Sequence, residues 1–223
     1  MQSRTSRVIG EENVKKLSNS NIAVLGVGGV GGYVVEMFAR LGVKNLTIVD
    51  FDTISVSNLN RQIIALKSNI NCLKVEEFKN RILNINPDCS VAAVAKKITK
   101  ENVGEILNKK FDFVIDAIDD IPAKIEVAKY CQENNIKLIS SMGTGNRYKM
   151  PKFEVSDITK TSYDKLAKKL RKLLKEQGVE NLTVVYTKEE AEKTEGLGSV
   201  VYYPLMCAGT IVSYVTNCLI ERK

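Results

Sequence analysis

A glycine-rich turn near the start of the chain constrains the fold more than any other feature of the sequence. The turn contains Gly26, Gly28, Gly29 and Gly31, which include the pattern G-x-G-x-x-G. It follows a short apolar run at residues 21–27 and precedes apolar residues at helical spacing over 30–41. A second apolar run at 45–50 ends in Asp50, which lies 19 residues after the last glycine. Strand, glycine turn, helix and strand in this order predict a unit whose helix N-terminus binds phosphate and whose acid binds a ribose.

The next hundred residues repeat this alternation of strands and helices. Strands are predicted at 90–95, 111–115 and 137–141, and helices at 73–85, 100–108 and 123–133. Strands that alternate with helices imply a mainly parallel sheet with helices on both faces. The predicted fold class is therefore α/β and Rossmann-like.

The pattern changes after residue 150. The sequence there predicts strands at 152–158 and 182–186, an amphipathic helix at 164–177 and an acidic loop at 188–196. No linker rich in Pro or Ser separates this portion from the rest. We therefore expect one domain over residues 1–223, with a nucleotide-binding core at 1–150 and a C-terminal portion at 151–223.

The last uncharged stretch is long enough to raise the question of a membrane span. Residues 196–220 carry no charge, but Pro204, Gly209 and several polar residues interrupt them. We predict a strand at 199–203 that turns at Pro204 into a buried helix, and we expect no stable membrane association.

Composition excludes several kinds of active site. The chain has no His, which excludes Ser-His-Asp and Cys-His nucleophilic sites and removes the commonest zinc ligand. Its five Cys form no C-x-x-C pair, so they are expected to be free thiols in a reducing compartment. The first 17 residues lack an apolar core of signal-peptide length. We therefore expect a cytoplasmic protein.

Positive charge is concentrated in one helix. The net charge is +7, and residues 160–175 alone carry seven basic side chains and one acidic one, a charge of +6. Leucines form an apolar stripe on the predicted helix, so its lysines are expected to face outward as a cationic strip: Lys165, Lys168, Lys169, Lys172 and Lys175. A local excess of this kind favours a polyanionic partner, although a merely solvated helix face would look the same.

Charged residues downstream of Asp50 distinguish between nucleotides. Arg61 and Lys74 have no evident use in a dinucleotide dehydrogenase, whereas two cations can neutralise the charge that develops on a leaving pyrophosphate. Three acids follow the strand at 111–115, at the end of the sheet where such folds bind ligands, and their carboxylates can hold Mg²⁺: Asp116, Asp119 and Asp120. Each residue alone is equally compatible with a salt bridge or a helix cap.

Taken together, these motifs resemble a known group of enzymes. GVGGVGG, DFD, SNLNRQ, Lys74 and DAIDD match, in order and spacing, the E1-like adenylating superfamily. Within it, the chain resembles the tRNA threonylcarbamoyladenosine dehydratase branch over nearly its whole length. The most specific part of this resemblance is residues 157–172, which carrier-protein-activating members lack.

The resemblance implies a set of site residues. It places ATP and Mg²⁺ on Gly26, Gly28, Gly29, Gly31, Asp50, Asp52, Asn58, Arg61, Gln62, Lys74 and Asp119, with Asp119 on the metal. Arg61, Lys74 and Asp119 would carry the catalysis together with Arg7, which the family donates to the partner subunit's ATP, so a homodimer is implied. The lysines of the cationic strip would then bind tRNA, and a sulfur-transfer protein is a further candidate partner.

The implied reaction is the ATP-dependent dehydration of N6-threonylcarbamoyladenosine in tRNA. The threonyl carboxylate would attack ATP to give an acyl-adenylate, and a nucleophile in the same side chain would close a ring and expel AMP. The main alternative is an adenylyltransferase that activates the C-terminus of a ubiquitin-like or sulfur-carrier protein. A NAD-linked oxidoreductase and a nucleotide-sensing module without turnover also remain open.

Overall fold

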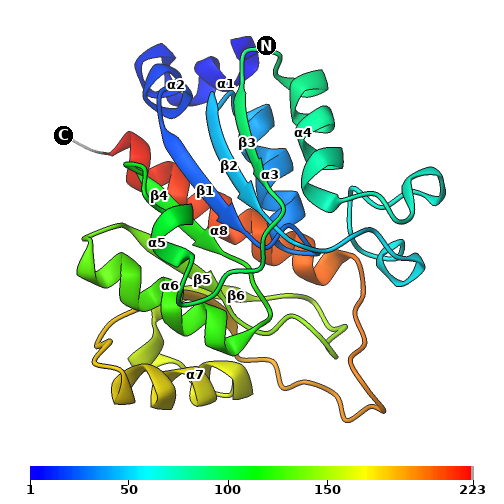
Figure 1. Ribbon diagram of the computed structural model, residues 1–223, viewed down its shortest axis with the longest axis vertical. Coiled ribbons are helices and arrows are strands. Elements are labelled where there is room, and N and C mark those ends of the chain that lie inside the picture. The colour runs from blue at the N-terminus through cyan, green and yellow to red at the C-terminus, as the bar shows by residue number, and fades with distance from the viewer. Residues whose placement is uncertain (222–223) are drawn as a thin grey trace.

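A seven-stranded sheet runs through the middle of the molecule, in the order β3-β2-β1-β4-β5-β7-β6 (Figure 1). The computed structural model describes residues 1–221. Its strands are β1 (Asn21–Leu25), β2 (Asn45–Val49), β3 (Ser90–Val94), β4 (Phe113–Asp116), β5 (Leu138–Ser141), β6 (Phe153–Asp157) and β7 (Thr183–Thr187). All neighbouring pairs are parallel except β6 with β7, so β6 forms an antiparallel edge.

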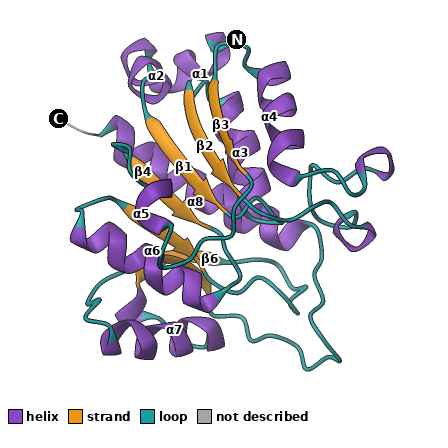
Figure 2. Ribbon diagram, viewed as in Figure 1, coloured by secondary structure: helices purple, strands orange, loops and turns teal. Residues whose placement is uncertain are grey.

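Helices cover both faces of this sheet (Figure 2). They are α1 (Ser3–Ile9), α2 (Glu11–Ser18), α3 (Gly31–Arg40), α4 (Lys74–Ile85), α5 (Val103–Ile106), α6 (Ile121–Glu133), α7 (Lys165–Glu176) and α8 (Tyr202–Ile220). Short 3-10 turns lie at Val56–Asn58, Lys67–Asn69 and Ile158–Lys160. One core cluster joins α3, α4 and α8 to the sheet, and two others lie under α5, α6 and α7. The predicted α/β, mainly parallel fold is confirmed.

Alternate residues of β1 explain how one strand serves two layers. Ile22 and Val24 pack in the cluster with α3 and α8, whereas Ala23 and Leu25 pack in the cluster with α5 and α6. All four are fully buried. A strand that is buried on both faces needs apolar residues at every position, which is why the sequence shows a continuous apolar run instead of an alternating one.

Near each end of the chain the structure differs from what the sequence suggests. The strand predicted at 199–203 is wrong, because α8 begins at Tyr202 and Pro204 lies in its first turn. Proline is tolerated there, since the first turn of a helix has no partner for its N–H groups. The sequence also showed no sign of α1 and α2, which are short and mostly exposed, with Leu17 as the one fully buried side chain they contribute.

α8 is apolar because it is a core helix. Within residues 1–221 it is the one helix long and apolar enough to cross a membrane, and 44% of its apolar window is buried inside the fold. Cys207, Ile211 and Val215 are fully buried in the cluster that also contains Val34 and Phe38 of α3. The packing against α3 accounts for the uncharged stretch that the sequence shows.

Candidate functional site

A cavity of about 1060 Å³ lies at the carboxyl ends of the parallel strands. Parallel α/β sheets bind ligands at this end, where loops gather (Figure 2). Its lining contains nearly all the predicted nucleotide contacts, namely Gly26, Gly28, Gly29, Asp50, Asp52, Asn58, Arg61, Gln62, Lys74 and Asp119. Gly31 does not line it and lies behind the turn.

The glycines of the turn have two different tasks. A Cβ on Gly26 would lie 2.7 Å from the Ala117 carbonyl oxygen, and one on Gly31 would lie 1.8 Å from the Gly26 carbonyl oxygen. Both positions therefore exclude a side chain, since the first turn of α3 packs directly on the loop after β1. Gly28 differs, because its nearest neighbour would be Gln62 Nε2 at 3.6 Å. Gly28 faces the cavity, so a phosphate can approach its backbone closely.

Asp50 holds the turn in place. Its carboxylate accepts hydrogen bonds from the backbone N–H groups of Val27 and Asp52, each at 2.9 Å. Burial raises the pKa of Asp50 above its usual value, although Lys74 and the two N–H donors oppose that effect. The residue predicted to bind the ribose thus also fixes the loop that would bind the phosphates.

The cations of the cavity are only partly satisfied. Lys74 Nζ lies 2.7 Å from Asp52 Oδ2, and the lysine side chain is 5% exposed while that of Asp52 is 49% exposed. Arg61 Nη1 donates to the Ser57 carbonyl at 2.8 Å and to Asn60 Oδ1 at 2.9 Å. These contacts hold both cations at the cavity wall with further N–H groups available to an anion.

Two side-chain amides next to the cations differ in whether their oxygen atoms are hydrogen-bonded. Asn58 Oδ1 accepts from the Ser55 N–H at 3.0 Å and so caps the short turn that carries it. Gln62 Oε1 is buried, and within residues 1–221 no partner reaches it. A buried polar atom without a partner is costly, so its presence on a cavity wall is what a ligand site would show.

Asp119 lies on the loop after β4 and is exposed to the cavity. In the described part of the chain no hydrogen bond or ion pair engages its carboxylate. Residues 1–221 contain no cluster of three or more acidic, Cys or His side chains that could hold a metal ion. The free carboxylate of Asp119 on the cavity wall fits a Mg²⁺ ion that this residue and nucleotide phosphates would hold together, which is how Mg²⁺ usually binds in such sites.

The structure adds a buried ion pair that the sequence did not suggest. Lys124 of α6 donates to Asp116 Oδ2 at 2.9 Å, to Ser140 Oγ at 2.9 Å and to the Ser141 carbonyl at 3.0 Å. Asp116 Oδ1 accepts from the Ile118 N–H at 3.0 Å. This cluster joins the ends of β4 and β5, which lead into the cavity loops at 117–120 and 142–147. No local sequence signal marks Lys124, since its partners lie 8 to 17 residues away.

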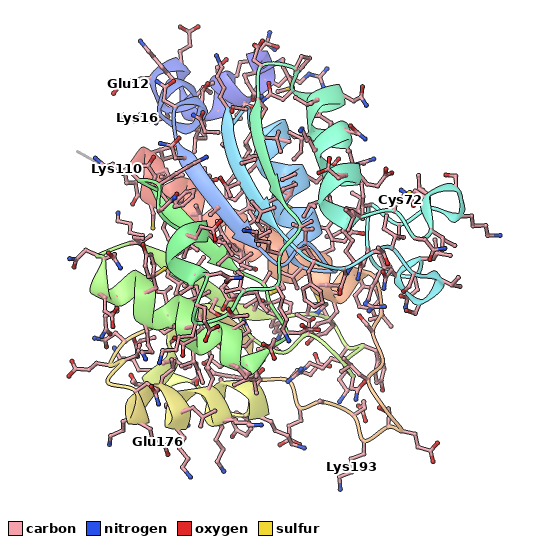
Figure 3. The ribbon with its side chains drawn as sticks, in the orientation of Figure 1. Glu12, Lys16, Cys72, Lys110, Glu176 and Lys193 are labelled. Carbon is pink, nitrogen blue, oxygen red and sulfur yellow. The ribbon has the colours of Figure 1, made fainter. Side chains whose placement is uncertain are left out.

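The acidic loop predicted at 188–196 proves to belong to the cavity wall. Glu190, Ala191, Lys193, Leu197 and Gly198 line the cavity, in an irregular segment between β7 and α8 that is mostly exposed. Figure 3 labels Lys193 on it.

Asn146 anchors that segment at several points. Its backbone N–H donates to the Gly198 carbonyl at 2.8 Å, its carbonyl accepts from the Glu192 N–H at 2.7 Å, and its side-chain Nδ2 donates to the Gly196 carbonyl at 3.1 Å. Asn146 thereby connects the loop after β5 to the segment that closes the cavity. The side-chain Oδ1 also accepts from the Gly198 N–H, and the sequence alone does not indicate any of these four hydrogen bonds.

The remaining predicted residues lie outside the cavity, with one exception. The five lysines of the cationic strip are all exposed on α7, as predicted, and Lys165 also lines the cavity. Arg7 is exposed on α1, whose end contacts the far end of α3 through Gln2 Nε2 and the Arg40 carbonyl at 2.8 Å. The glycine turn is at the other end of α3, about 15 Å away for a ten-residue helix. Arg7 does not line the cavity of its own subunit, and the helix that carries it starts beside the opposite end of α3.

The cysteines keep away from this cavity. None of the five lines it. Burial raises the pKa of the Cys89 thiol to about 11 and of the Cys131 and Cys207 thiols to about 12. Cys72 is exposed on the loop before α4 (Figure 3).

Comparison with known proteins assigns this architecture. A model of the ThiF family matches residues 2–222. The chain belongs to the ThiF family. It is 41% identical to the tRNA threonylcarbamoyladenosine dehydratase of Bacillus subtilis over 188 residues, which are 84% of this chain and 74% of that protein. The family match thus covers both the motifs of the sequence and the cavity that they line.

A solved relative carries a nucleotide. The chain is similar to the crystal structure of the E. coli tRNA N6-threonylcarbamoyladenosine dehydratase in complex with ATP, with a TM-score of 0.93 and 32% identity over 98% of this chain and 93% of that one. It is also 35% identical to the molybdopterin-synthase adenylyltransferase of Haemophilus influenzae over 126 residues, which are 56% of this chain and 51% of that protein. The first likeness extends over the whole fold, whereas the second covers about half of it.

Proposed function

We propose that this ThiF-family protein is an ATP-dependent dehydratase that acts on N6-threonylcarbamoyladenosine in tRNA. One observation carries the proposal: a cavity built for a triphosphate continues to the first residue of a strongly basic helix, since Lys165 of α7 lines the same cavity as Lys74. The ATP complex of the E. coli relative supports the nucleotide. The tRNA substrate is supported by the name of the Bacillus subtilis relative, to which 84% of this chain is similar.

The nucleotide half of the reaction follows from the cavity wall. Gly28 presents its backbone at the N-terminal end of α3, where the helix dipole favours the phosphates. Asp50 accepts the ribose hydroxyls. Arg61 and Lys74 face the triphosphate and neutralise the charge that develops on the leaving pyrophosphate. Mg²⁺, held by Asp119 and phosphate oxygens, would supply further charge neutralisation there.

The substrate half needs little from the protein beyond positioning. A carboxylate is a poor electrophile because its leaving group would be oxide. Attack of the threonyl carboxylate on the α-phosphorus of ATP releases pyrophosphate and forms an acyl-adenylate, whose leaving group is AMP. A nucleophile in the same side chain then attacks the acyl carbon and expels AMP, so that the nucleoside loses one water. An intramolecular attack has a high effective concentration, and no cavity thiol is required.

The assembly we propose is a homodimer in the cytoplasm. Arg7 lies on the side of its own subunit that is opposite the cavity. It would therefore act on the nucleotide of a second subunit. Mixing an Arg7→Ala chain with a Lys74→Ala chain should then restore part of the activity, because each mixed dimer retains one intact site. A monomer with full activity would contradict this. A sulfur-transfer protein remains a candidate partner, testable by co-purification.

A second candidate function is the activation of a carrier-protein C-terminus, which the likeness to molybdopterin-synthase adenylyltransferase favours. ATP–pyrophosphate exchange separates the two. The purified protein is incubated with labelled pyrophosphate and ATP, together with either tRNA that bears threonylcarbamoyladenosine or a ubiquitin-like carrier protein. We expect exchange and dehydrated nucleoside with the modified tRNA alone. Unmodified tRNA is the matched control, and exchange with the carrier protein alone would overturn the proposal.

A further inference from the structure

An aromatic side chain projects into the mouth of the cavity from a strained turn. Tyr163 lines the cavity, and 66% of the residue's surface is exposed to solvent. Its φ is +62°, the left-handed region that bulky L-residues rarely adopt. The Asp164 N–H donates to the Ser162 carbonyl at 2.8 Å and closes a three-residue turn with Tyr163 at its centre. Turns of this kind with positive φ are rare and strained.

The residues on either side hold this turn rigidly. Asp164, which is 4% exposed, caps α7 by accepting the Ala167 N–H at 2.8 Å. Its other oxygen pairs with Arg147 Nη2 at 3.5 Å. On the opposite side, the Thr161 carbonyl accepts from Arg171 Nη1 at 3.0 Å. The turn is therefore fixed at both ends, while the ring between them is left in solvent.

Arg147 connects the same turn to the cavity loops. It donates to the carbonyls of Gly143 at 2.9 Å and Glu189 at 2.8 Å, and is itself 6% exposed. The position of Tyr163 is thus set relative to both the loop after β5 and the segment after β7. Packing of the ring does not compensate for the strained backbone, because the ring is mostly exposed. A strained residue that the surrounding structure holds in place without burying it suggests a task outside the fold.

We propose that the Tyr163 ring is a stacking platform for a base of the tRNA at or beside the modified adenosine, and that the neighbouring Lys165 contacts the adjoining phosphate. This inference rests on the proposed function. Proteins read single-stranded RNA by stacking splayed bases on aromatic rings, and such stacking is tolerant of sequence. Tyr163 lies between the cavity and the cationic strip of α7, where an RNA chain bound to that strip would have to turn its modified nucleotide inward.

The base of ATP has a different neighbour. Phe51 follows Asp50 directly and also lines the cavity, with an exposed fraction of 52%. A ribose on Asp50 brings the adenine toward Phe51, whereas Tyr163 belongs to the turn before α7. We therefore assign the two rings to different ligands, and the experiment has to separate them.

A fluorescent substitution tests the platform directly. The chain contains no Trp, so Tyr163→Trp introduces a single Trp that would stack on a base in the same way. Modified tRNA should quench its emission, whereas saturating ATP alone should leave it nearly unchanged. Quenching by ATP alone would assign the ring to the nucleotide and overturn the inference. So would unchanged emission under conditions where filter binding shows that the tRNA is bound.

Kinetics of further variants supply the second measurement. Loss of one stacked base should raise the KM for tRNA about 5- to 150-fold in Tyr163→Ala with little change in the KM for ATP, while Tyr163→Phe stays near wild type. Tyr163→Gly should lose the same affinity yet unfold at an equal or higher temperature, because glycine tolerates the positive φ. The matched control is Tyr148→Ala, which removes a ring that is 57% exposed and does not line the cavity.

The outcomes distinguish this inference from the proposed function. If the wild-type protein neither binds nor dehydrates the modified tRNA, the proposed function fails. If it does both and Tyr163→Ala behaves like wild type, the stacking platform alone is wrong.

Discussion

Two Lys–Asp pairs lie near the same end of the sheet and differ in what surrounds them. Lys124 and Asp116 are 2.9 Å apart, and each side chain is 1% exposed. Lys74 and Asp52 are 2.7 Å apart, with side-chain exposures of 5% and 49%. The ion pairs have nearly the same length, so the distance between charges says little about their roles.

The number of remaining partners separates the two pairs. Each N–H of Lys124 has an acceptor, on Asp116, Ser140 and Ser141. Within residues 1–221, Lys74 has one acceptor, on Asp52, in a cavity wall. A lysine whose three N–H groups all have acceptors within the protein has a structural role. A lysine with unused N–H groups can donate hydrogen bonds to a ligand. We infer that the first pair stabilises the cavity loops and the second pair is available to bind phosphate.

The largest effect on folding should come from Lys124. Lys124→Met leaves the Asp116 carboxylate buried without a cation and should lower the free energy of unfolding by about 3–5 kcal/mol. Urea denaturation measures this. The double variant Lys124→Met with Asp116→Leu should recover part of the loss, because it removes the unpaired charge as well. A single variant as stable as wild type would remove the distinction between the two pairs.

Lys74 should show the opposite behaviour. Lys74→Met should lower the rate of pyrophosphate release about 10²- to 10³-fold, as removal of a group that stabilises developing charge does. Its free energy of unfolding should fall by less than that of Lys124→Met, since Asp52 is half exposed and remains solvated. The two measurements are made on the same preparation. A large loss of stability together with unchanged turnover would mean that Lys74, like Lys124, stabilises the fold and does not act on the nucleotide.

These two lysines also show which parts of the site can be predicted from the sequence. Lys74 was predictable because the glycine turn, Asp50 and Arg61 precede it in a fixed order along one stretch of chain. Lys124 was not, because its acceptors come from two strands and are brought together by the sheet. The same holds for Asn146 and Arg147, which contact the irregular segment after β7. Continuous apolar runs marked the strands well, whereas short exposed helices such as α1 carry no such signal.

The cationic strip extends the comparison to lysines with no partner at all. In the described part of the chain, no ion pair or hydrogen bond involves the side chains of Lys168, Lys169 and Lys172. Replacing all three by Gln should weaken tRNA binding about tenfold at moderate salt and reduce the salt slope by about 0.7–0.9 per lysine. ATP affinity should not change.

Three other exposed lysines provide the control for the strip. Lys44, Lys109 and Lys110 are exposed before β2 and β4, at the end of the sheet away from the cavity. Replacing them by Gln removes the same charge and should leave the salt slope as in wild type. Equal losses in both triple variants would mean that net charge alone attracts the tRNA.

The smallest effect is expected from Asp52. Asp52→Ala removes the acceptor of Lys74 and should lower the free energy of unfolding by less than Lys124→Met does, because the Asp52 side chain is 49% exposed and Asp50 remains close to Lys74. Thermal and urea unfolding give the value. A loss as large as that of Lys124→Met would show that partial exposure does not weaken this pair.

The packing of α8 has a consequence for how the chain is made on the ribosome. The faces of Val34 and Phe38 on α3 are covered by Cys207, Ala208 and Ile211, which are synthesised some 170 residues later. β7 also has to insert between β5 and β6 before the sheet is complete. The nascent nucleotide-binding half therefore emerges with an uncovered apolar face and cannot reach its final state until α8 has been synthesised. We expect fragments that end near residue 150 to aggregate or to need a chaperone, however complete their phosphate-binding motif is.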